Sequence, residues 1–403
     1  MSHVVVIGAG QAGASCVAKL RTEGFDGQIT LIGAEPVPPY QRPPLSKAYL
    51  LGEMAEERLY LRPEAFYADN NITLRLTAWV SDINAADKTV HLEGGETITY
   101  DDLVLTTGSF PRKLPASIGG DLDGVFTVRD LADADAMAPA FTEGKRLLVI
   151  GGGYIGLEAA AVASKLGLQV TLVEMADRIL QRVAAPETSD YFRTLHSDHG
   201  VDIREGVGLT RLVGDGHVTG AELTDGTILD IDFAVVGVGI APATVLAESA
   251  GVDVGNGIVT DDHGRTSDPH IWAAGDCATC NFEGQTIRLE SVGNAIDQAE
   301  AVAVNIAGGD KPYEPKPWFW SDQYDCKLQI AGLNMGYTDV YVRKGDGGAQ
   351  SHWYYKGDRL IAVDAMNDAR NYMIGKRLIE GGKSPDPALI IDPDTDMKAL
   401  MRA

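Results

Sequence analysis

The sequence contains no apolar segment approaching the length of about 18 residues that marks a transmembrane helix. Its N-terminus leads directly into the apolar segment Val4–Ile7, without the features of a secretory signal. We therefore expect neither a membrane protein nor a secreted one, but a cytoplasmic protein. Its 403 residues allow two to three domains.

Cysteine is scarce, with four in the chain. Four thiols do not make the disulfide framework of a small secreted domain, as expected in a reducing compartment. Cys277 and Cys280 have the spacing of a redox-active dithiol, but no activating charge adjoins either thiol, so we favour two small residues beside a cofactor loop. His196 and His199 lack an accompanying set of cysteine or acidic ligands. We expect surface histidines there and no metal site.

Basic residues are few relative to acidic ones: 34 Lys and Arg against 57 Asp and Glu give a net charge of −23. Such an acidic chain is a poor general partner for nucleic acid or an anionic membrane. The excess acid lies entirely in residues 1–315, because residues 316–403 hold 12 basic and 12 acidic side chains. The C-terminal part is therefore neutral and can carry local basic patches.

What the sequence does have is a glycine-rich turn after its first apolar segment. Val4–Ile7 is followed by Gly8-Ala-Gly-Gln-Ala-Gly13, and residues 12–20 predict a helix. In this spacing, Gly8, Gly10 and Gly13 bring the free N–H groups of a helix N-terminus to a pyrophosphate. Alone the motif is weak, because such turns also occur without a ligand.

The same motif returns 143 residues later as Gly151-Gly-Gly-Tyr-Ile-Gly156. Each copy is followed, about 20 residues on, by an acid at the end of a second strand, Glu35 and Glu174. A carboxylate there accepts the ribose hydroxyls of adenosine, and Glu174 favours NADH because it repels the extra phosphate of NADPH. Arg178 and Arg182 keep NADPH open as an alternative. Two complete motifs predict two dinucleotide sites.

Each copy also has a later apolar strand that ends in glycine, at Asp102–Gly108 and at Asp232–Gly239. These predict an α/β fold with two Rossmann-like dinucleotide-binding domains. Farther on, a short strand ends at Asp276, whose carboxylate suits the ribityl chain of a flavin. A helix that opens at Glu290 would stabilise the negative charge of a reduced flavin with its N-terminus.

The stretch from Pro36 to Lys47 is rich in proline, so we predict rigid, extended backbone there. Glu158 lies two residues past the third glycine of the second motif, among apolar neighbours. A carboxylate buried in such surroundings is costly unless it meets a cation. Lys47 is the candidate partner, and a solvated lysine at the start of the next helix is the alternative.

The chain after the proline-rich linker Lys311–Pro317 carries three of the five tryptophans. Alternating segments such as 353–363 predict hairpins and residues 368–380 predict a helix, so this part is a small α+β domain. Alternation over residues 73–108 predicts a small β-meander inserted in the first unit. Tryptophans are mostly core residues, and Trp320 is the exception that we expect to reach a ligand.

Several motifs together resemble the FAD-dependent ferredoxin reductases of oxygenase systems, over essentially the whole chain. Beside the two glycine motifs, the resemblance rests on Arg42-Pro-Pro-Leu-Ser-Lys47, Ala274-Gly-Asp-Cys277, Glu290-Ser-Val292 and Trp318-Phe-Trp-Ser-Asp-Gln323. The first and last of these are far more specific than a glycine motif. Thr106 and Ala243 depart from the family pattern at domain edges, away from the chemistry.

The resemblance implies a glutathione-reductase-like architecture, with Lys47 paired to Glu158 beside the reactive flavin nitrogen and Trp320 near the flavin. It implies an FAD-binding domain from residues 1–109 and 243–315, an NADH-binding domain from 110–242, and a C-terminal α+β domain from 316–403. The implied FAD contacts are Gly8, Gly10, Ala12, Gly13, Glu35, Arg42, Lys47, Val80, Arg129, Asp276 and Val292. The implied NADH contacts are Gly151, Gly153, Tyr154, Ile155, Gly156, Glu174, Gly239 and Glu290.

The implied activity is hydride transfer from NADH to FAD, followed by single-electron transfers to a 2Fe–2S ferredoxin that serves a haem-thiolate monooxygenase. Such ferredoxins are acidic, so we expect docking through Arg288, Lys311, Lys316 and Arg343. Two alternatives stay open. A disulfide reductase shares the fold but needs a dithiol beside the flavin, and a redox-responsive binding protein like apoptosis-inducing factor shares the cofactors.

Overall fold

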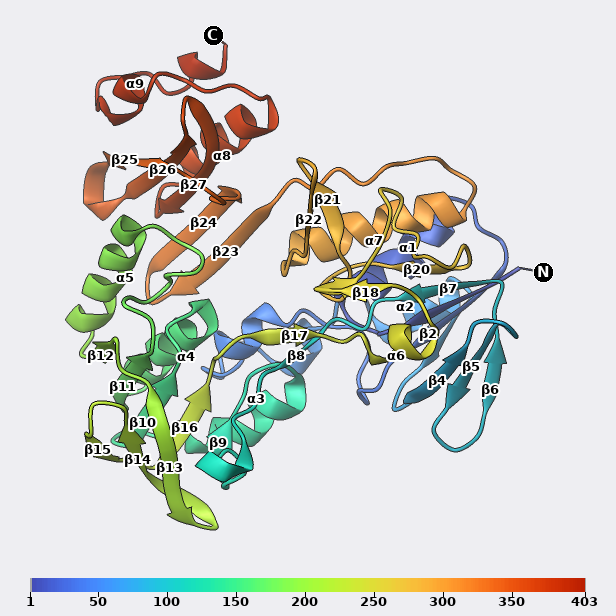
Figure 1. Ribbon diagram of the computed structural model, residues 1–403, viewed down its shortest axis with the longest axis horizontal. Helices are drawn as coiled ribbons and strands as arrows, with labels where there is room; N and C mark the ends of the chain where they lie inside the picture. The colour runs from blue at the N-terminus through green and yellow to red at the C-terminus, as the bar shows by residue number, and fades with distance from the viewer. Residues whose placement is uncertain (1, 403) are drawn as a thin grey trace. The chain divides into compact units, whose positions relative to one another are not determined.

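The computed structural model describes residues 2–402, which divide into two compact units (Figure 1). The first unit takes in residues up to 41, 56–110 and 240–317, and the second takes in 42–55, 111–239 and 318 onward. The boundaries predicted from the sequence assign FAD to residues 1–109 and 243–315, NADH to 110–242, and no nucleotide to 316–403. They stay a prediction, because packing alone does not reveal which nucleotide a unit binds.

The first unit is built on a five-stranded parallel sheet in the order β20-β7-β1-β2-β3. In β1, Val4 and Val6 join one buried cluster while Val5 and Ile7 join another, so both faces are covered. A strand covered on both faces has a continuous apolar sequence, which is the pattern seen at residues 4–7. The strands are β1 (His3–Ile7), β2 (Gln28–Ile32), β3 (Ile72–Arg75), β7 (Asp102–Leu105) and β20 (Ile271–Ala273).

Two helices of the first unit, α1 (Gln11–Thr22) and α7 (Val292–Ile306), pack against each other through buried alanine and valine side chains. The predicted β-meander is confirmed for residues 80–99, which form an antiparallel three-stranded sheet of β4 (Val80–Asn84), β5 (Thr89–Leu92) and β6 (Thr97–Thr99). The two ends of the predicted range were wrong, because they form β3 and β7 of the parallel sheet. Shorter elements complete the unit: α2 (Glu64–Asp69), α6 (Val245–Ser249), β17 (Ile240–Pro242), β18 (Val254–Gly255), β19 (Gly257–Ile258), β21 (Cys280–Phe282), β22 (Gln285–Ile287) and the 3₁₀ turn η2 (Glu56–Arg58).

The second unit repeats the parallel design with a sheet in the order β12-β11-β10-β16-β9. The strands are β9 (Val125–Phe126), β10 (Arg146–Ile150), β11 (Gln169–Glu174), β12 (Asp202–Glu205) and β16 (Phe233–Val236). Its helices are α3 (Leu131–Met137), α4 (Tyr154–Lys165) and α5 (Pro186–Asp198). An antiparallel sheet of β13 (Leu209–Asp215), β14 (His217–Leu223) and β15 (Ile228–Asp230) accompanies it, with the 3₁₀ turns η3 (Ala116–Ile118) and η4 (Ala138–Ala140). The strand β8 (Ser109–Pro111) begins in the first unit, where it pairs with β17.

The C-terminal part of the second unit is a five-stranded antiparallel sheet in the order β23-β24-β27-β26-β25. Its strands are β23 (Trp318–Gln323), β24 (Cys326–Gly332), β25 (Asp339–Lys344), β26 (Gln350–Lys356) and β27 (Arg359–Met366). Helix α8 (Ala369–Glu380) covers it, and α9 (Pro387–Ile391), η5 (Asp346–Gly348) and η6 (Ala399–Met401) complete it. The predicted α+β organisation is confirmed. Among residues 2–402, no helix combines the length and apolar character needed to cross a membrane.

The prediction of extended backbone up to Lys47 was wrong at its end, because Pro43–Ser46 forms a 3₁₀ turn, η1. Proline fixes φ near −65°, and this value suits the first turn of a helix as well as extended chain. The two prolines occupy the first helical positions, where their missing N–H groups cost nothing. The turn places the side chains of Ser46 and Lys47 in one short segment of the second unit.

Candidate nucleotide and redox site

The three glycines of the first motif differ in the space that a side chain would have at each position. A Cβ on Gly8, whose φ is +114°, would lie 2.1 Å from the carbonyl oxygen of Thr106, and one on Gly13 would lie 2.0 Å from the carbonyl oxygen of Gly8. A Cβ on Gly10 would meet nothing within 4 Å. Helix α1 begins there with no side-chain cap, so its first N–H groups are available to an anion. Open space beside uncapped N–H groups fits a pyrophosphate.

Thr106 is a residue that sequence reasoning missed. Its hydroxyl donates to the carbonyl oxygens of Gly8 at 2.9 Å and Ile7 at 3.1 Å, so it fixes the turn from the neighbouring strand. The interpretation of Thr106 as a departure away from the chemistry overlooked this role. An alanine there could not make either bond, and no local sequence pattern indicates that this hydroxyl reaches a turn 98 residues away.

Other residues of the first unit that are implied to hold FAD are polar groups with partners of their own. Glu35 accepts a hydrogen bond from the Tyr40 hydroxyl at 2.6 Å, and the Asp276 carboxylate accepts one from Ser109 at 3.0 Å. Helix α7 begins at Val292 after the cap Ser291, whose hydroxyl takes the N–H of Asn294. The helix start and both carboxylates therefore have fixed positions. Val80 is the first residue of β4. Ala12 lies in the first turn of α1.

The second glycine motif reproduces the first. Gly151 has φ of +106°, and a Cβ on it would lie 2.4 Å from the carbonyl oxygen of Gly237; one on Gly156 would lie 2.1 Å from the carbonyl oxygen of Gly151. A Cβ on Gly153 would meet nothing within 4 Å, and α4 starts there without a side-chain cap. The predicted duplication is confirmed in backbone detail as well as in sequence.

Glu174 anchors the loops around this second turn. One carboxylate oxygen accepts the N–H of Gly152 at 2.7 Å, and the other accepts the N–H of Ala176 at 2.8 Å. Each oxygen keeps a second acceptor site, so the carboxylate can still receive ribose hydroxyls. Arg178, one of the two arginines that keep NADPH open as an alternative, donates to the Ser189 hydroxyl at 2.5 Å. The choice of NADH over NADPH stays a prediction.

Tyr154 and Ile155 are the first residues of helix α4, directly after the second glycine turn. The Tyr154 ring lies 4.9 Å from that of Phe319, and its buried hydroxyl has no hydrogen-bond partner among residues 2–402. An unpartnered buried hydroxyl fits a site that a polar ligand group completes. Ile155 beside it is 43% exposed, and Gly239 has φ of +97°.

The predicted ion pair between Lys47 and Glu158 is present in the second unit. Lys47 Nζ lies 2.7 Å from Glu158 Oε2, with side-chain exposures of 15% and 1%. Sequence reasoning did not identify two further partners, Ser46 and Ser321, whose hydroxyls donate to the Glu158 carboxylate at 2.7 and 2.6 Å. One cation and two hydroxyl donors offset the cost of burying the Glu158 carboxylate. Whether the pair lies beside a flavin stays a prediction.

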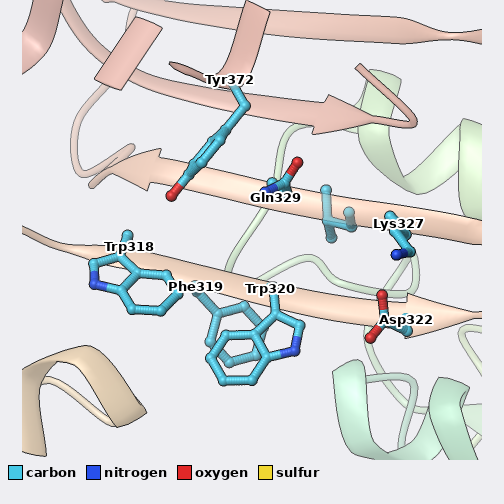
Figure 2. Close-up of a pocket in the computed structure, with 8 residues that line it drawn as sticks. Trp318, Phe319, Trp320, Asp322, Lys327, Gln329 and Tyr372 are labelled. Atoms are coloured by element: carbon cyan, nitrogen blue, oxygen red, sulfur yellow. The ribbon is translucent and has the colours of Figure 1, made fainter. Parts of the chain in front are cut away.

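Trp320 lies on an aromatic face of the second unit, shown in Figure 2. Trp318, Trp320 and Asp322 are every second residue of β23, so their side chains lie on one face, along one edge of a hollow (Figure 2). Gln329 of β24 and Tyr372 of α8 line the other side of this hollow. The Trp318 and Trp320 rings stack with centroids 5.4 Å apart. Trp320 is half-buried rather than a core residue, and its ring also lies 6.5 Å from that of Phe319. Whether Trp320 reaches a flavin stays a prediction.

Two of the four predicted docking residues are wrong. The Arg343 side chain is buried, and its guanidinium donates to the carbonyl oxygens of Ile390, Asp392, Pro393 and Thr395. The Arg288 side chain is 9% exposed, pairs with Glu290 at 2.6 Å and donates to the carbonyl oxygen of Asp276. Both arginines stabilise local backbone. Lys311 and Lys316 are exposed and remain candidates.

Arg42 and Arg129, both implied FAD contacts, are joined to each other in the second unit. The Arg42 guanidinium donates to the backbone carbonyl oxygen of Arg129 at 2.8 Å. This bond fixes the start of η1 relative to the segment before α3. Their part in binding a nucleotide stays a prediction.

The prediction of a surface His196 was wrong. The ring is fully buried on the inner face of α5, and burial lowers its pKa to about 4. Its Nε2 lies 2.8 Å from Gln323 Oε1 on β23, a partner 127 residues away that no local pattern indicates. His199, three residues on, is exposed as predicted.

The four cysteines provide no reactive dithiol. All are free and buried, and burial raises the pKa of Cys277 and raises that of Cys280 to about 11. A thiol must ionise to attack, so raised pKa values make both poor nucleophiles. The Cys277 thiol instead contacts the carbonyl oxygens of Leu105 and Ala274 at 3.4 Å. The interpretation of Cys277 and Cys280 as small packing residues agrees with this geometry.

Two glycine turns with the geometry of dinucleotide-binding motifs, each open at its middle glycine, fit an oxidoreductase that uses a flavin and a pyridine nucleotide. Comparison with known proteins gives the family. Residues 2–299 match the family described as pyridine nucleotide-disulphide oxidoreductase, and residues 318–401 match the family described as reductase C-terminal. The chain belongs to the first of these families.

Its relatives are similar over their full length. A ferredoxin–NAD(P)+ reductase of Sphingomonas sp. is 44% identical, with 99% of this chain and 97% of the relative covered. Putidaredoxin reductase of Pseudomonas putida is 40% identical, with 100% and 97% covered. A crystal structure of the covalent putidaredoxin reductase–putidaredoxin complex matches with a TM-score of 0.96, at 40% identity and coverage of 100% and 98%. The protein is an oxidoreductase that uses FAD and NAD(P)H.

Proposed function

We propose that this protein passes electrons from NADH through FAD to a 2Fe–2S ferredoxin, which in turn serves a haem-thiolate monooxygenase. The observation that carries the proposal is the buried pair of Lys47 and Glu158, in a segment where disulfide reductases of this fold need a dithiol. Full-length similarity to ferredoxin reductases supports the choice of acceptor. We also propose a cytoplasmic location, supported by four free thiols, which cell fractionation would test.

When bound, FAD supplies the conversion of a hydride pair into single electrons. The chain itself holds and orients the two nucleotides and supplies charge. The uncapped N-termini of α1 and α4 receive the pyrophosphates, and Glu35 and Glu174 receive the ribose hydroxyls. Glu158 holds the Lys47 ammonium, whose positive charge would favour a negatively charged reduced ring. This chemistry requires no general base.

Cytochrome c reduction by NADH, with and without candidate 2Fe–2S ferredoxins from the same genome, tests the proposed function. We expect slow reduction by the protein alone and a large, saturable stimulation by its own ferredoxin. A protein whose flavin is reduced rapidly by NADH, but whose rate no ferredoxin raises, would contradict the proposed acceptor.

Glu174→Ala should weaken the preference for NADH. The carboxylate is expected to receive the ribose hydroxyls and to repel a phosphate, so its loss should raise the KM for NADH about tenfold and lower that for NADPH. Steady-state reduction of ferricyanide with each coenzyme measures the ratio of kcat/KM values. Glu205→Ala is the matched control, because Glu205 also accepts a loop N–H, that of Ile179. An unchanged ratio in Glu174→Ala would show that specificity lies elsewhere.

Neutralising Lys311 and Lys316 should slow the reduction of ferredoxin without slowing that of ferricyanide. Both lysines are exposed, and a rim charge acts mainly on association with an acidic partner. We expect the double alanine variant to raise the KM for ferredoxin severalfold at low salt, with a smaller effect at high salt. Lys344→Ala, which removes another exposed charge, is the control. Equal loss with both acceptors would refute docking at these lysines.

A further inference from the structure

A buried chain of hydrogen bonds leads away from Glu158 through the second unit. Ser321 donates to Glu158 at 2.6 Å, and Gln323 Nε2 donates to Ser321 Oγ at 3.1 Å. Gln323 Oε1 lies 2.8 Å from His196 Nε2, and the Tyr324 hydroxyl lies 3.2 Å from His196 Nδ1. Ser321, Gln323 and His196 are all 0% exposed. The chain therefore joins α4, β23 and α5 without solvent.

The direction of each bond follows from the orientation of the Gln323 amide, whose oxygen faces His196. An amide oxygen can only accept, so in this orientation His196 donates from Nε2, and its neutral ring accepts at Nδ1 from the Tyr324 hydroxyl. His196 is neutral near pH 7, because burial lowers its pKa to about 4. With Oε1 committed to His196, the Gln323 amide presents its N–H to Ser321. The single Ser321 proton is then left for Glu158.

The chain is unsuited to moving protons. An amide nitrogen such as that of Gln323 does not pass on its hydrogen without becoming an imidic acid, so proton transfer stops there. Instead, the chain of hydrogen bonds favours one orientation of the Gln323 side-chain amide. If the Gln323 amide turned over, its oxygen would face Ser321, and the Ser321 proton could leave Glu158. That arrangement would leave the Nε2–H of His196 without an acceptor, so His196 would have to take its other tautomer at the same time.

We propose that His196 is a remote positioning residue, which acts through Gln323 and Ser321 to hold Glu158 as the fully hydrogen-bonded partner of Lys47. This inference deepens the proposed function and rests on it, since the Lys47 charge matters most if a flavin is reduced beside it. The ligand class concerned is the reduced isoalloxazine ring. Neither the glycine motifs nor the motif around Lys47 indicates a part for α5 in this chemistry.

Four variants separate positioning from mere packing. His196→Phe keeps a ring and removes the donor, and His196→Gln restores an amide donor near the position of Nε2. Gln323→Met breaks the same link from the other side with a side chain of similar shape, in case His196→Phe does not fold. His199→Phe is the matched control, because His199 ends the same helix and stacks on Tyr324 at 3.7 Å but lies outside the chain.

The first measurement is independent of turnover: the ¹³C signal of the Glu158 carboxyl group in flavin-free protein, assigned with Glu158→Gln. We expect His196→Phe and Gln323→Met to shift or split this signal, and His196→Gln and His199→Phe to leave it as in the wild type. The second measurement is the limiting rate of flavin reduction by NADH, which should fall about tenfold in the first two variants only.

A wild-type Glu158 signal and a wild-type reduction rate in folded His196→Phe or Gln323→Met would overturn the positioning role. So would an effect in His196→Phe that His196→Gln does not restore, because that result would indicate packing alone. Failure of the proposed function would be distinct: NADH would then reduce no flavin in the wild type, while the Glu158 signal would still respond to His196.

Discussion

Gly10→Ala should yield a folded but colourless protein. Gly10 has φ of −94°, which alanine adopts freely, and a Cβ there would meet no protein atom within 4 Å. The methyl group would instead occupy the space that the pyrophosphate needs beside the first N–H groups of α1. We expect FAD affinity to fall at least about a hundredfold, with little change in the stability of the flavin-free protein.

Flavin absorbance per chain and the unfolding midpoint of flavin-free protein measure the two effects separately. Gly8→Ala is the contrasting variant, because its Cβ would lie 2.1 Å from the carbonyl oxygen of Thr106 at a φ of +114°. It should lose both flavin and stability. Gly153→Ala should keep FAD and lose affinity for NADH. A yellow Gly10→Ala protein with one FAD per chain would exclude the first turn as the FAD site.

Glu158→Gln should slow the reduction of the flavin by NADH about a hundredfold at saturating NADH. The substitution leaves the Lys47 ammonium, 15% exposed, without its counter-ion and turns an amide N–H toward a hydroxyl that now donates to Glu158. Lys47→Met should act similarly, because it leaves a carboxylate at 1% exposure without a cation. Breaking a buried pair in this way costs about 3–5 kcal/mol of folding free energy.

Stopped-flow absorbance gives the rate, and urea unfolding gives the free energy. Lys165 and Glu53 provide the control, since they form a pair at 2.8 Å in the same unit with exposures of 53% and 55%. Lys165→Met should cost less than about 1 kcal/mol and leave the rate unchanged. If Glu158→Gln lost stability but reduced its flavin at the normal rate, the pair would be structural only.

The parts of the fold that sequence predicts well are those that adjacent residues determine. An apolar strand, three spaced glycines and a following helix are dictated within about 20 residues, and both copies form as predicted. The need of Glu158 for a cation could be predicted because a carboxylate in apolar surroundings is costly to bury alone, and the family resemblance implied that Lys47 supplies it. In each case the physical requirement is visible in the residues themselves.

The predictions that were wrong depend on partners distant in sequence. Arg343 was predicted to dock a partner because its charge is visible in the sequence. The carbonyl groups that accept hydrogen bonds from its guanidinium lie 47 to 52 residues away and are not. The sequence around His196 does not reveal its hydrogen bond to Gln323, which lies 127 residues away. The sequence around Thr106 likewise does not reveal that its hydroxyl donates to the carbonyl oxygen of Gly8. Pro43 and Pro44 were ambiguous for a different reason, since one value of φ suits two backbone conformations.

The most direct test of the central claim is an anaerobic transfer experiment on protein whose thiols have been alkylated. NADH is added until the flavin bleaches, and oxidised 2Fe–2S ferredoxin is then mixed in while both chromophores are followed. We expect full bleaching by NADH and reduction of about two ferredoxins per flavin, at the rate of unmodified protein. Loss of transfer after alkylation, or a protein that binds no flavin, would contradict electron flow between two nucleotides without a sulfur relay.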